Sequence, residues 1–310
     1  MRSLLIFALV GLGAQLVDGA LGMAFGVTAS TLLVLSGVAA AQASAAVHLA
    51  EVGTTLASGL SHWRFKNIDW RIVLKLGVPG AIGAFAGATV LSSLSTEDAA
   101  PLMAAILLVI GVYVLLRFSL RTPPVFRSGA TPHTAKFLTP LGLFGGFIDA
   151  SGGGGWGPVT TSTLLSRGKT APRTVIGSVS ASEFLVAVSA SMGFLVGLRE
   201  EFLHNIPIVA GLAAGGVVAA PLAAWLVSKI SPALLGTAVG GVIVLTNAQK
   251  LVKYFGIHGA VSTAIYAVIV AAWAGLVLVA WRTSRAPEYV LEDIEESVDE
   301  PTEQAEAPTR

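Results

Sequence analysis

The sequence predicts an all-α polytopic membrane protein, built from two inverted structural repeats with glycine-broken or re-entrant helices, plus one extra C-terminal transmembrane helix. Three observations predict this fold class. The 310-residue chain is 54% hydrophobic and 12% charged, with a mean hydropathy of +0.77, which is far more apolar than a soluble domain. Apolar segments of membrane-spanning length follow one another along the chain. A pattern of aspartate and glycine occurs twice, once in each half.

Nine apolar segments define the predicted elements, and most are close to the ~20 residues that cross a bilayer. The first and fifth are too long for one crossing, and each contains a glycine cluster, GALG at 19–22 and GGGG at 152–155. Lipid cannot satisfy freed backbone groups, so such breaks must face protein or a water-filled cavity. We expect these two segments to be re-entrant hairpins. The nine segments are 3–37, 41–61, 72–94, 99–116, 138–166, 173–198, 205–227, 231–248 and 259–281.

An internal repeat connects the two long segments. Four residues of the first match four of the second at a constant offset of 131, and Glu51 later pairs with Glu183. The organisation predicted is a first repeat (1–116), a basic cytoplasmic linker (117–137), a second repeat (138–253), a final transmembrane helix (254–282) and an acidic disordered tail (283–310). The matched residues are Gly11, Asp18, Gly22 and Gly26 with Gly142, Asp149, Gly153 and Gly157.

Loop charges indicate how the halves are oriented. Basic residues gather at 61–75 in the first half and at 167–173 in the second, which are non-equivalent loops of the two repeats. The positive-inside rule then makes the halves face opposite ways, provided that both long segments are hairpins. Lys250 and Lys253 would lie outside in this scheme, which is the main charge evidence against it. A plain nine-span topology stays open as the alternative.

Composition also excludes several classes of function. The net charge is only +1, so no basic face is available for nucleic acid. The chain has no cysteine, which removes thiolate catalysis, cysteine-ligated metal clusters and disulfides. No GxSxG, HExxH or paired-aspartate motif accompanies the available serine and histidine residues. We therefore expect no enzyme activity, no cofactor and no metal.

The glycine cluster of the second half predicts an anion site. Consecutive glycines let the backbone turn and approach a ligand closely, and Trp156 then begins a new helix whose free N–H groups favour an anion. Tight helix packing is the alternative role for these glycines, and for GALG alone we favour it. The candidate substrate-binding residues are Ser151, Gly152, Gly153, Gly154, Gly155, Trp156, Thr160 and Thr161, with Gly22 and Thr28 from the first half.

Ionisable residues within apolar segments are costly and are therefore functional candidates. Glu51 and Glu183 occupy equivalent positions in the two halves, and a buried carboxyl of this kind can carry a proton at neutral pH. His48 lies one turn before Glu51 and could pass a proton to it. Asp18 and Asp149 precede the glycine turns, where capping of the following helix and proton coupling remain equally open. On the first helix, residues at spacings of three and four predict one polar face: His48, Glu51, Thr55, Ser58 and His62.

Three stretches of this sequence resemble a known family. They are GLFGGFIDASGGGGWGPVTTSTLL, its weaker copy GLGAQLVDGALGMAFGVTASTLLVL, and PGAIGAFAGA. The chain resembles the sulfite exporter TauE/SafE family, also called the toluene sulfonate uptake permease family, up to about residue 281. The resemblance implies a multi-pass carrier of the bacterial inner membrane for sulfite, organosulfonate or related sulfur-containing or carboxylated anions. This chain has fewer glycines in its first copy, and acidic residues where many members have neutral ones.

The function predicted from these features is secondary-active transport of a small anion, with coupling to protons. The implied partners are the lipid bilayer, a small anionic substrate and protons, without nucleic acid, and the sequence leaves a homodimer open. An anion channel is the first alternative, because a channel needs no coupling residue. An intramembrane enzyme is the second.

Overall fold

The computed structural model describes residues 2–21, 23–120, 133–199, 202, 205–227 and 231–283. Every regular element in these ranges is helical, and five helices are long and apolar enough to cross a membrane. The all-α polytopic fold class is thereby confirmed. The elements are α1 (Arg2–Leu21), α2 (Phe25–Leu35), α3 (Ala40–Arg64), α4 (Trp70–Ser93), α5 (Thr96–Leu120), α6 (Ala135–Gly152), η1 (Gly157–Thr161), α7 (Ser162–Ser166), α8 (Pro172–Leu198), α10 (Ile206–Val227), α11 (Pro232–Tyr254) and α12 (Ala260–Thr283).

Both long apolar segments contain a helix break where the sequence predicts one. The first divides into α1 and α2, and the second into α6 and the η1–α7 helix. In the second break, Gly153 has φ +74° and ends α6 in the left-handed region that glycine adopts without steric cost. Most of the predicted linker 117–137 and nearly all of the tail 283–310 lie outside the described residues.

The second long segment folds back on itself. Arg167, directly after α7, places its guanidinium 3.6 Å from the ring centroid of Phe137, which lies at the start of α6. The two ends of the α6–η1–α7 segment therefore lie together, and its turn lies at the glycines. In the first long segment, a Cβ on Gly13 of α1 would contact Leu32 of α2, so α1 and α2 also run alongside each other in opposite directions.

Helices α3 and α8 meet along their polar faces. The hydroxyls of Ser58 and Ser180 are 2.7 Å apart, and the Asp69 N–H, just after α3, donates to the Ser178 hydroxyl at 2.8 Å. The C-terminal end of α3 is therefore beside the N-terminal end of α8. We call this end of the molecule the basic end, because the adjoining residues include Arg64, Lys66, Arg167, Lys169 and Arg173.

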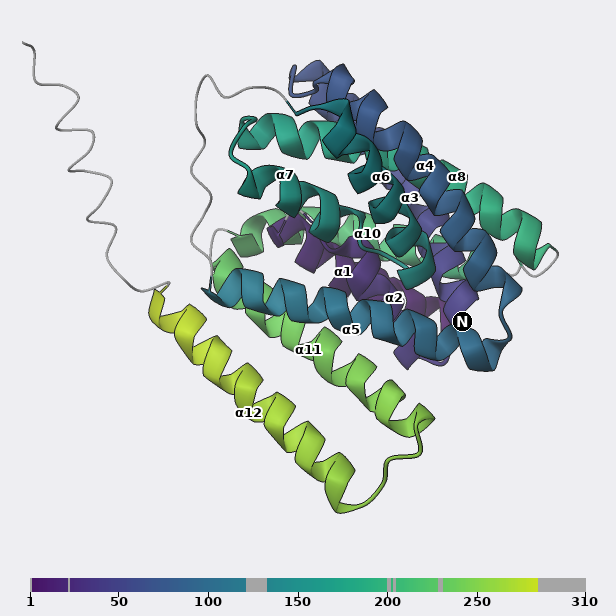
Figure 1. Cartoon of the computed structure of the whole chain (residues 1–310), viewed down its shortest axis with the longest axis vertical. Coiled ribbons are helices and arrows are strands. Elements are labelled where there is room, and N and C mark those ends of the chain that lie inside the picture. Colours follow the sequence, from purple (N-terminus) through teal and green to yellow (C-terminus); the bar gives the residue numbers. More distant parts are fainter. Residues whose placement is uncertain are drawn as a thin grey trace, which may run out of the picture.

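The remaining long helices pack in pairs around this centre (Figure 1). Helix α6 runs parallel to α4 and α1 runs parallel to α10, each pair at glycine-mediated close contact. One contact recurs in both pairs: Gly142 lies against the Leu76 carbonyl, and its counterpart Gly11 lies against the Leu212 carbonyl. Small residues allow this close backbone approach within a membrane bundle. Helix α11 packs against α5.

The two breaks contact each other at the centre of the bundle. A Cβ on Gly26 would lie 2.8 Å from the Cα of Gly154, and a Cβ on Gly157 would lie 2.9 Å from the Cβ of Met23. The internal repeat relates the two contacts to each other. Gly157 is the counterpart of Gly26, and Gly154 is the counterpart of Met23. Neither glycine could become a larger residue without separating the two turns.

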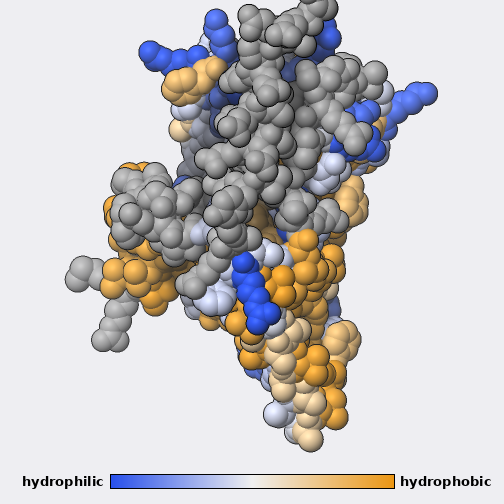
Figure 2. Space-filling view, turned by 90° about the vertical axis from the view of Figure 1, so that its left-hand side faces the viewer, coloured by the Kyte–Doolittle hydropathy of each residue, from blue (hydrophilic) through white to orange (hydrophobic). Residues whose placement is uncertain are grey.

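The outer surface is apolar over the helices that extend beyond this centre. Figure 2 shows hydrophobic side chains over the lower part of the molecule, where α11 and α12 lie, and hydrophilic ones gathered toward the top. Helix α12 is almost wholly exposed and is held to α11 by the Trp273 indole N–H, which donates to the Thr237 carbonyl at 3.1 Å. Such an apolar exposed surface is the one that lipid covers.

Candidate functional site

A cavity of about 310 Å³ lies where the two breaks meet. Both turns contribute to its wall, and helices α3 and α8 supply the polar side chains opposite them. It extends from the breaks to His62 in the last turn of α3, so it approaches the basic end. Its lining residues are Gln15, Asp18, Met23, Ala24, Phe25, Gly26, Val27, Glu51, Thr54, Thr55, Ser58, His62, Asp149, Gly155, Trp156, Gly157, Pro158, Thr161, Ile176, Val179, Ser180 and Glu183.

Two aspartates cap the helices that begin after the breaks. Asp18 Oδ1 accepts from the N–H groups of Ala24 and Phe25 at 2.9 and 3.1 Å, and Asp149 Oδ1 accepts from the Trp156 N–H at 2.8 Å. In both cases the carboxylate bonds the residue seven positions further on. The capping role that the sequence left open is therefore present at both positions, and each carboxylate occupies an N–H group that would otherwise be free for an anion.

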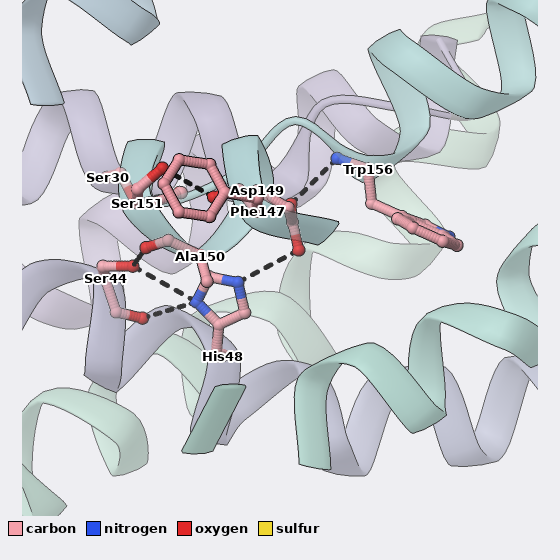
Figure 3. Close-up of polar contacts among 9 residues, drawn as sticks. Ser30, Ser44, His48, Phe147, Asp149, Ala150, Ser151 and Trp156 are labelled. Atoms are coloured by element: carbon pink, nitrogen blue, oxygen red, sulfur yellow. Dashed lines mark hydrogen bonds and ion pairs between the residues drawn. The ribbon is translucent and has the colours of Figure 1, made fainter. Parts of the chain in front are cut away.

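His48 is fully buried and links α3 to the second break (Figure 3). Its Nε2 atom is 3.1 Å from Asp149 Oδ2, and its Nδ1 atom is 2.8 Å from the Ser44 carbonyl oxygen. The Ser44 hydroxyl donates to the Ala150 carbonyl at 2.7 Å, so a second bond joins the same two elements. The sequence placed His48 beside Glu51, but its side-chain partner in the structure is Asp149.

Glu51 and Glu183 face the cavity without a partner. Glu51 is 5% exposed, yet its carboxyl oxygens have no hydrogen bond or ion pair among the described residues, and the same holds for the half-buried Glu183. No Lys or Arg lines the cavity. An unpaired buried carboxylate is strongly unfavourable, so each group requires a proton or a bound cation when it is out of water.

The predicted polar face of α3 is largely a wall of the cavity. Glu51, Thr55, Ser58 and His62 all line it, while His48 lies behind Asp149. The equivalent face of α8 contributes Ser180 and Glu183.

The candidate substrate-binding residues separate into two groups. Gly155, Trp156 and Thr161 line the cavity. Gly152 and Gly153 face α5 instead, and Gly154 lies against the backbone of Gly26 and Val27. Ser151 and Thr160 donate to backbone carbonyls of their own segment, and Thr28 lines a separate apolar pocket beside α11. Gly22 lies outside the described residues.

Trp156 fixes the second turn against three helices. Its side chain is fully buried, its indole N–H donates to the Val179 carbonyl of α8 at 3.2 Å, and Gly80 and Gly145 leave room for the ring. A Cβ on Gly80 would lie 2.5 Å from the ring, so α4 can pack here only because it has glycine at this point.

Several residues of the site carry too weak a signal to be found in the sequence. Gln15 and Met23 line the cavity from the first break, and Ser44 orients His48 from one turn away. Ser30 donates to the Gly153 carbonyl and so joins the two breaks. A serine in a small-residue helix is common, and only the position of the other half gives it a partner. No group of three or more His, Asp or Glu side chains in the described ranges could hold a metal ion.

Comparisons with known proteins identify the family of this chain. The family model described as sulfite exporter TauE/SafE matches residues 7–250. The chain is 50% identical over 278 residues to the "Probable membrane transporter protein YtnM" of Bacillus subtilis (strain 168), covering 90% of this chain and 92% of that protein. It is 23% identical over 194 residues to the "Probable membrane transporter protein YdhB" of the same organism, covering 62% and 79%. No solved structure gives a significant match. The chain is thus a membrane transporter of the sulfite exporter TauE/SafE family.

Proposed function

We propose that this protein is a proton-coupled secondary transporter of small sulfur-containing or carboxylated anions, such as sulfite or an organosulfonate, in the bacterial inner membrane. The observation that carries the proposal is the cavity at which both helix breaks and four carboxyl groups meet. The carboxyls belong to Asp18, Glu51, Asp149 and Glu183. Substrate sites at the junction of two broken helices are typical of transporters built from repeats.

The paths of the two hairpins support inverted repeats. The α6–η1–α7 hairpin has both ends at the basic end, while α2 leads into the start of α3, which lies at the opposite end. The two hairpins would then enter the membrane from opposite sides. The exchanged glycine contacts between the breaks support a pseudo-two-fold axis between them. Positive-inside orientation makes the basic end cytoplasmic.

Basic loop residues can attract an anion to the cavity, and N–H groups at the helix starts can hold it there. The cavity approaches the basic end, where the loop charges raise the local concentration of anions. Gly26 and Val27 line the cavity in the first turn of α2, and Asp18 bonds neither of their N–H groups. These N–H groups and the start of η1 are the positive ends of two helices.

Proton coupling follows from the charge of the cavity wall. A carboxylate 4 Å from an anion costs about 4 kcal/mol at an effective dielectric constant of 20, and several such groups line this cavity. Glu51 and Glu183 must therefore be protonated when the anion binds. Anion and proton binding then favour each other, and reciprocity requires that lower pH tightens anion binding.

Flux measurements in proteoliposomes test this function. Sulfite, a short alkyl sulfonate and a carboxylate would be offered separately, with and without an inwardly acidic or inwardly alkaline pH gradient. We expect at least one of these anions to accumulate above equilibrium only when a pH gradient is imposed. Flux that never exceeds the electrochemical equilibrium of the anion under any gradient would indicate a channel and contradict the proposal.

A further inference from the structure

The contact between His48 and Asp149 must contain a proton. A carbonyl oxygen can only accept, so the 2.8 Å contact with the Ser44 carbonyl places a hydrogen on Nδ1 of His48. The Ser44 hydroxyl already donates to Ala150, so it accepts at most from that same N–H. A neutral His48 then presents a lone pair at Nε2, opposite Asp149 Oδ2 at 3.1 Å. Two acceptors cannot form a hydrogen bond, so either the imidazole or the carboxyl carries one extra proton.

The pair is buried, and no Lys or Arg lines the cavity that Asp149 faces. His48 is 0% exposed and Asp149 2%, and the imidazole ring packs against Phe194 of α8 with centroids 6.0 Å apart. The other acidic groups that line the cavity with Asp149 are Glu51 on α3, Glu183 on α8 and Asp18 on α1. No cation among the described residues replaces the proton if it leaves. Loss of the proton therefore costs His48 one of its two hydrogen bonds: either Nε2 faces Asp149 Oδ2 without a hydrogen between them, or the hydrogen moves from Nδ1 to Nε2 and the Ser44 carbonyl loses its donor.

Opening this contact would move the wall of the cavity. Asp149 also holds the Trp156 N–H, so a shift of Asp149 is transmitted directly to the start of η1. Trp156 and Gly155 line the cavity. The two elements on either side of the contact, α3 and the second hairpin, belong to different halves of the chain.

We propose that His48 and Asp149 share one proton that latches the second hairpin onto α3, and that release of this proton lets the hairpin move. The inference rests on the proposed proton-coupled function and identifies the residues that convert a proton into movement. Asp149 itself lines the cavity beside Glu51, so the proton exchanges with the cavity from the Asp149 side of the contact.

Among the described residues, the first hairpin has no equivalent contact with α8. In the internal repeat, the counterpart of His48 is Ser180 on α8. The Ser180 hydroxyl forms a hydrogen bond with the Ser58 hydroxyl instead of with Asp18. Asp18 has only backbone partners. The two hairpins are therefore not equivalent, and only the second one responds to a proton.

A cysteine reporter tests the latch without any transport. The natural chain is free of cysteine, so Ala150→Cys gives a single thiol at a residue that is 0% exposed beside the contact. In purified protein without substrate, we expect the rate of thiol labelling, divided by the rate for a free thiol at the same pH, to rise at least about tenfold as pH increases across the titration, the factor that corresponds to about 1.4 kcal/mol. Asp149→Asn in the same background should remain slowly labelled at every pH, because the amide keeps the Trp156 bond and donates to neutral His48 without a titratable proton.

Asp18→Asn is the matched control, and it should keep the pH dependence of the reporter. Nitrogen-15 spectra of the imidazole give a second readout, in which His48 should keep a protonated Nδ1 in both the wild type and Asp149→Asn. Equal pH dependence of labelling in the reporter protein with and without Asp149→Asn would overturn the latch. If the latch titrates as expected but no anion accumulates under a pH gradient, the latch stands and the proposed transport function is wrong. Gradient-driven accumulation by Asp149→Asn at the wild-type level would overturn the latch's role in coupling and leave the function intact.

Discussion

At the scale of single residues, the two aspartates before the helix breaks differ in their partners. Asp18 and Asp149 stood out because carboxyls are rare in apolar segments, and capping and coupling were equally compatible with their positions. In the structure both aspartates cap a helix. Among the described residues, only Asp149 of the two also contacts a histidine. That partner is 101 residues away along the chain, so no local pattern could predict it.

His133 is a second buried histidine, and it lies outside the membrane-spanning segments, just before α6. It is 7% exposed, its ring stacks on Phe137 at 5.8 Å, and neither ring nitrogen has a hydrogen-bond partner among the described residues. Removal from water, together with the nearby charges of Lys169 and Arg167, lowers the pKa of His133. Protonation here would add a further positive charge beside Lys169 and Arg167, where the two ends of the second hairpin meet.

We therefore expect His133 to make the protein less stable in acid. Because its pKa is lower in the folded state than the ~6.5 of an unperturbed histidine, the unfolded state binds more protons as pH falls below ~6.5, and folding stability decreases. His133→Phe keeps the stacking and removes the titration. The midpoint of thermal unfolding in detergent should fall less between pH ~7.5 and ~5.5 in this variant than in the wild type. Equal decreases in both proteins would show that His133 does not contribute.

At the scale of helices, most of the fold was accessible from the sequence. Nine apolar segments correspond to the helices of the structure within a few residues, because apolar length is the dominant signal in a membrane protein. The breaks at the glycine clusters were also predicted. Which glycines face the substrate was not, because Gly154 and Gly155 are neighbours of the same type, and only the packing of the other half distinguishes them.

The re-entrant path of the second hairpin is testable by single cysteines. Thr134 and Ser166 are exposed residues on either side of the α6–η1–α7 segment, and Ser36 is exposed after α2. With both hairpins as described, Thr134→Cys and Ser166→Cys should be protected from an impermeant thiol reagent in intact cells, while Ser36→Cys should react. Permeabilised cells provide the control for reactivity. Labelling of only one of Thr134→Cys and Ser166→Cys from outside would mean that the segment crosses the membrane once.

At the scale of the whole molecule, the cavity depends on both halves at once. The carboxyls that line it come from α1, α3, α6 and α8, and they converge only because the two breaks contact each other. The repeat in the sequence indicates that Glu51 and Glu183 occupy equivalent positions in the two halves. It does not indicate that both line one cavity. Neither carboxyl has a hydrogen-bond partner among the described residues, whereas a buried carboxyl with a purely structural role would be hydrogen-bonded.

Substitution of these two glutamates by glutamine tests the central claim, proton-coupled anion transport, most directly. Glutamine mimics the protonated acid and cannot release a proton, so Glu51→Gln and Glu183→Gln should keep or strengthen anion binding and flatten its pH dependence. In proteoliposomes, both variants should still exchange labelled for unlabelled anion, and both should lose accumulation driven by a pH gradient. The loss should be greater for Glu51→Gln, because Glu51 is the group one turn from His48. Accumulation against a gradient at the wild-type level in both variants would contradict the account.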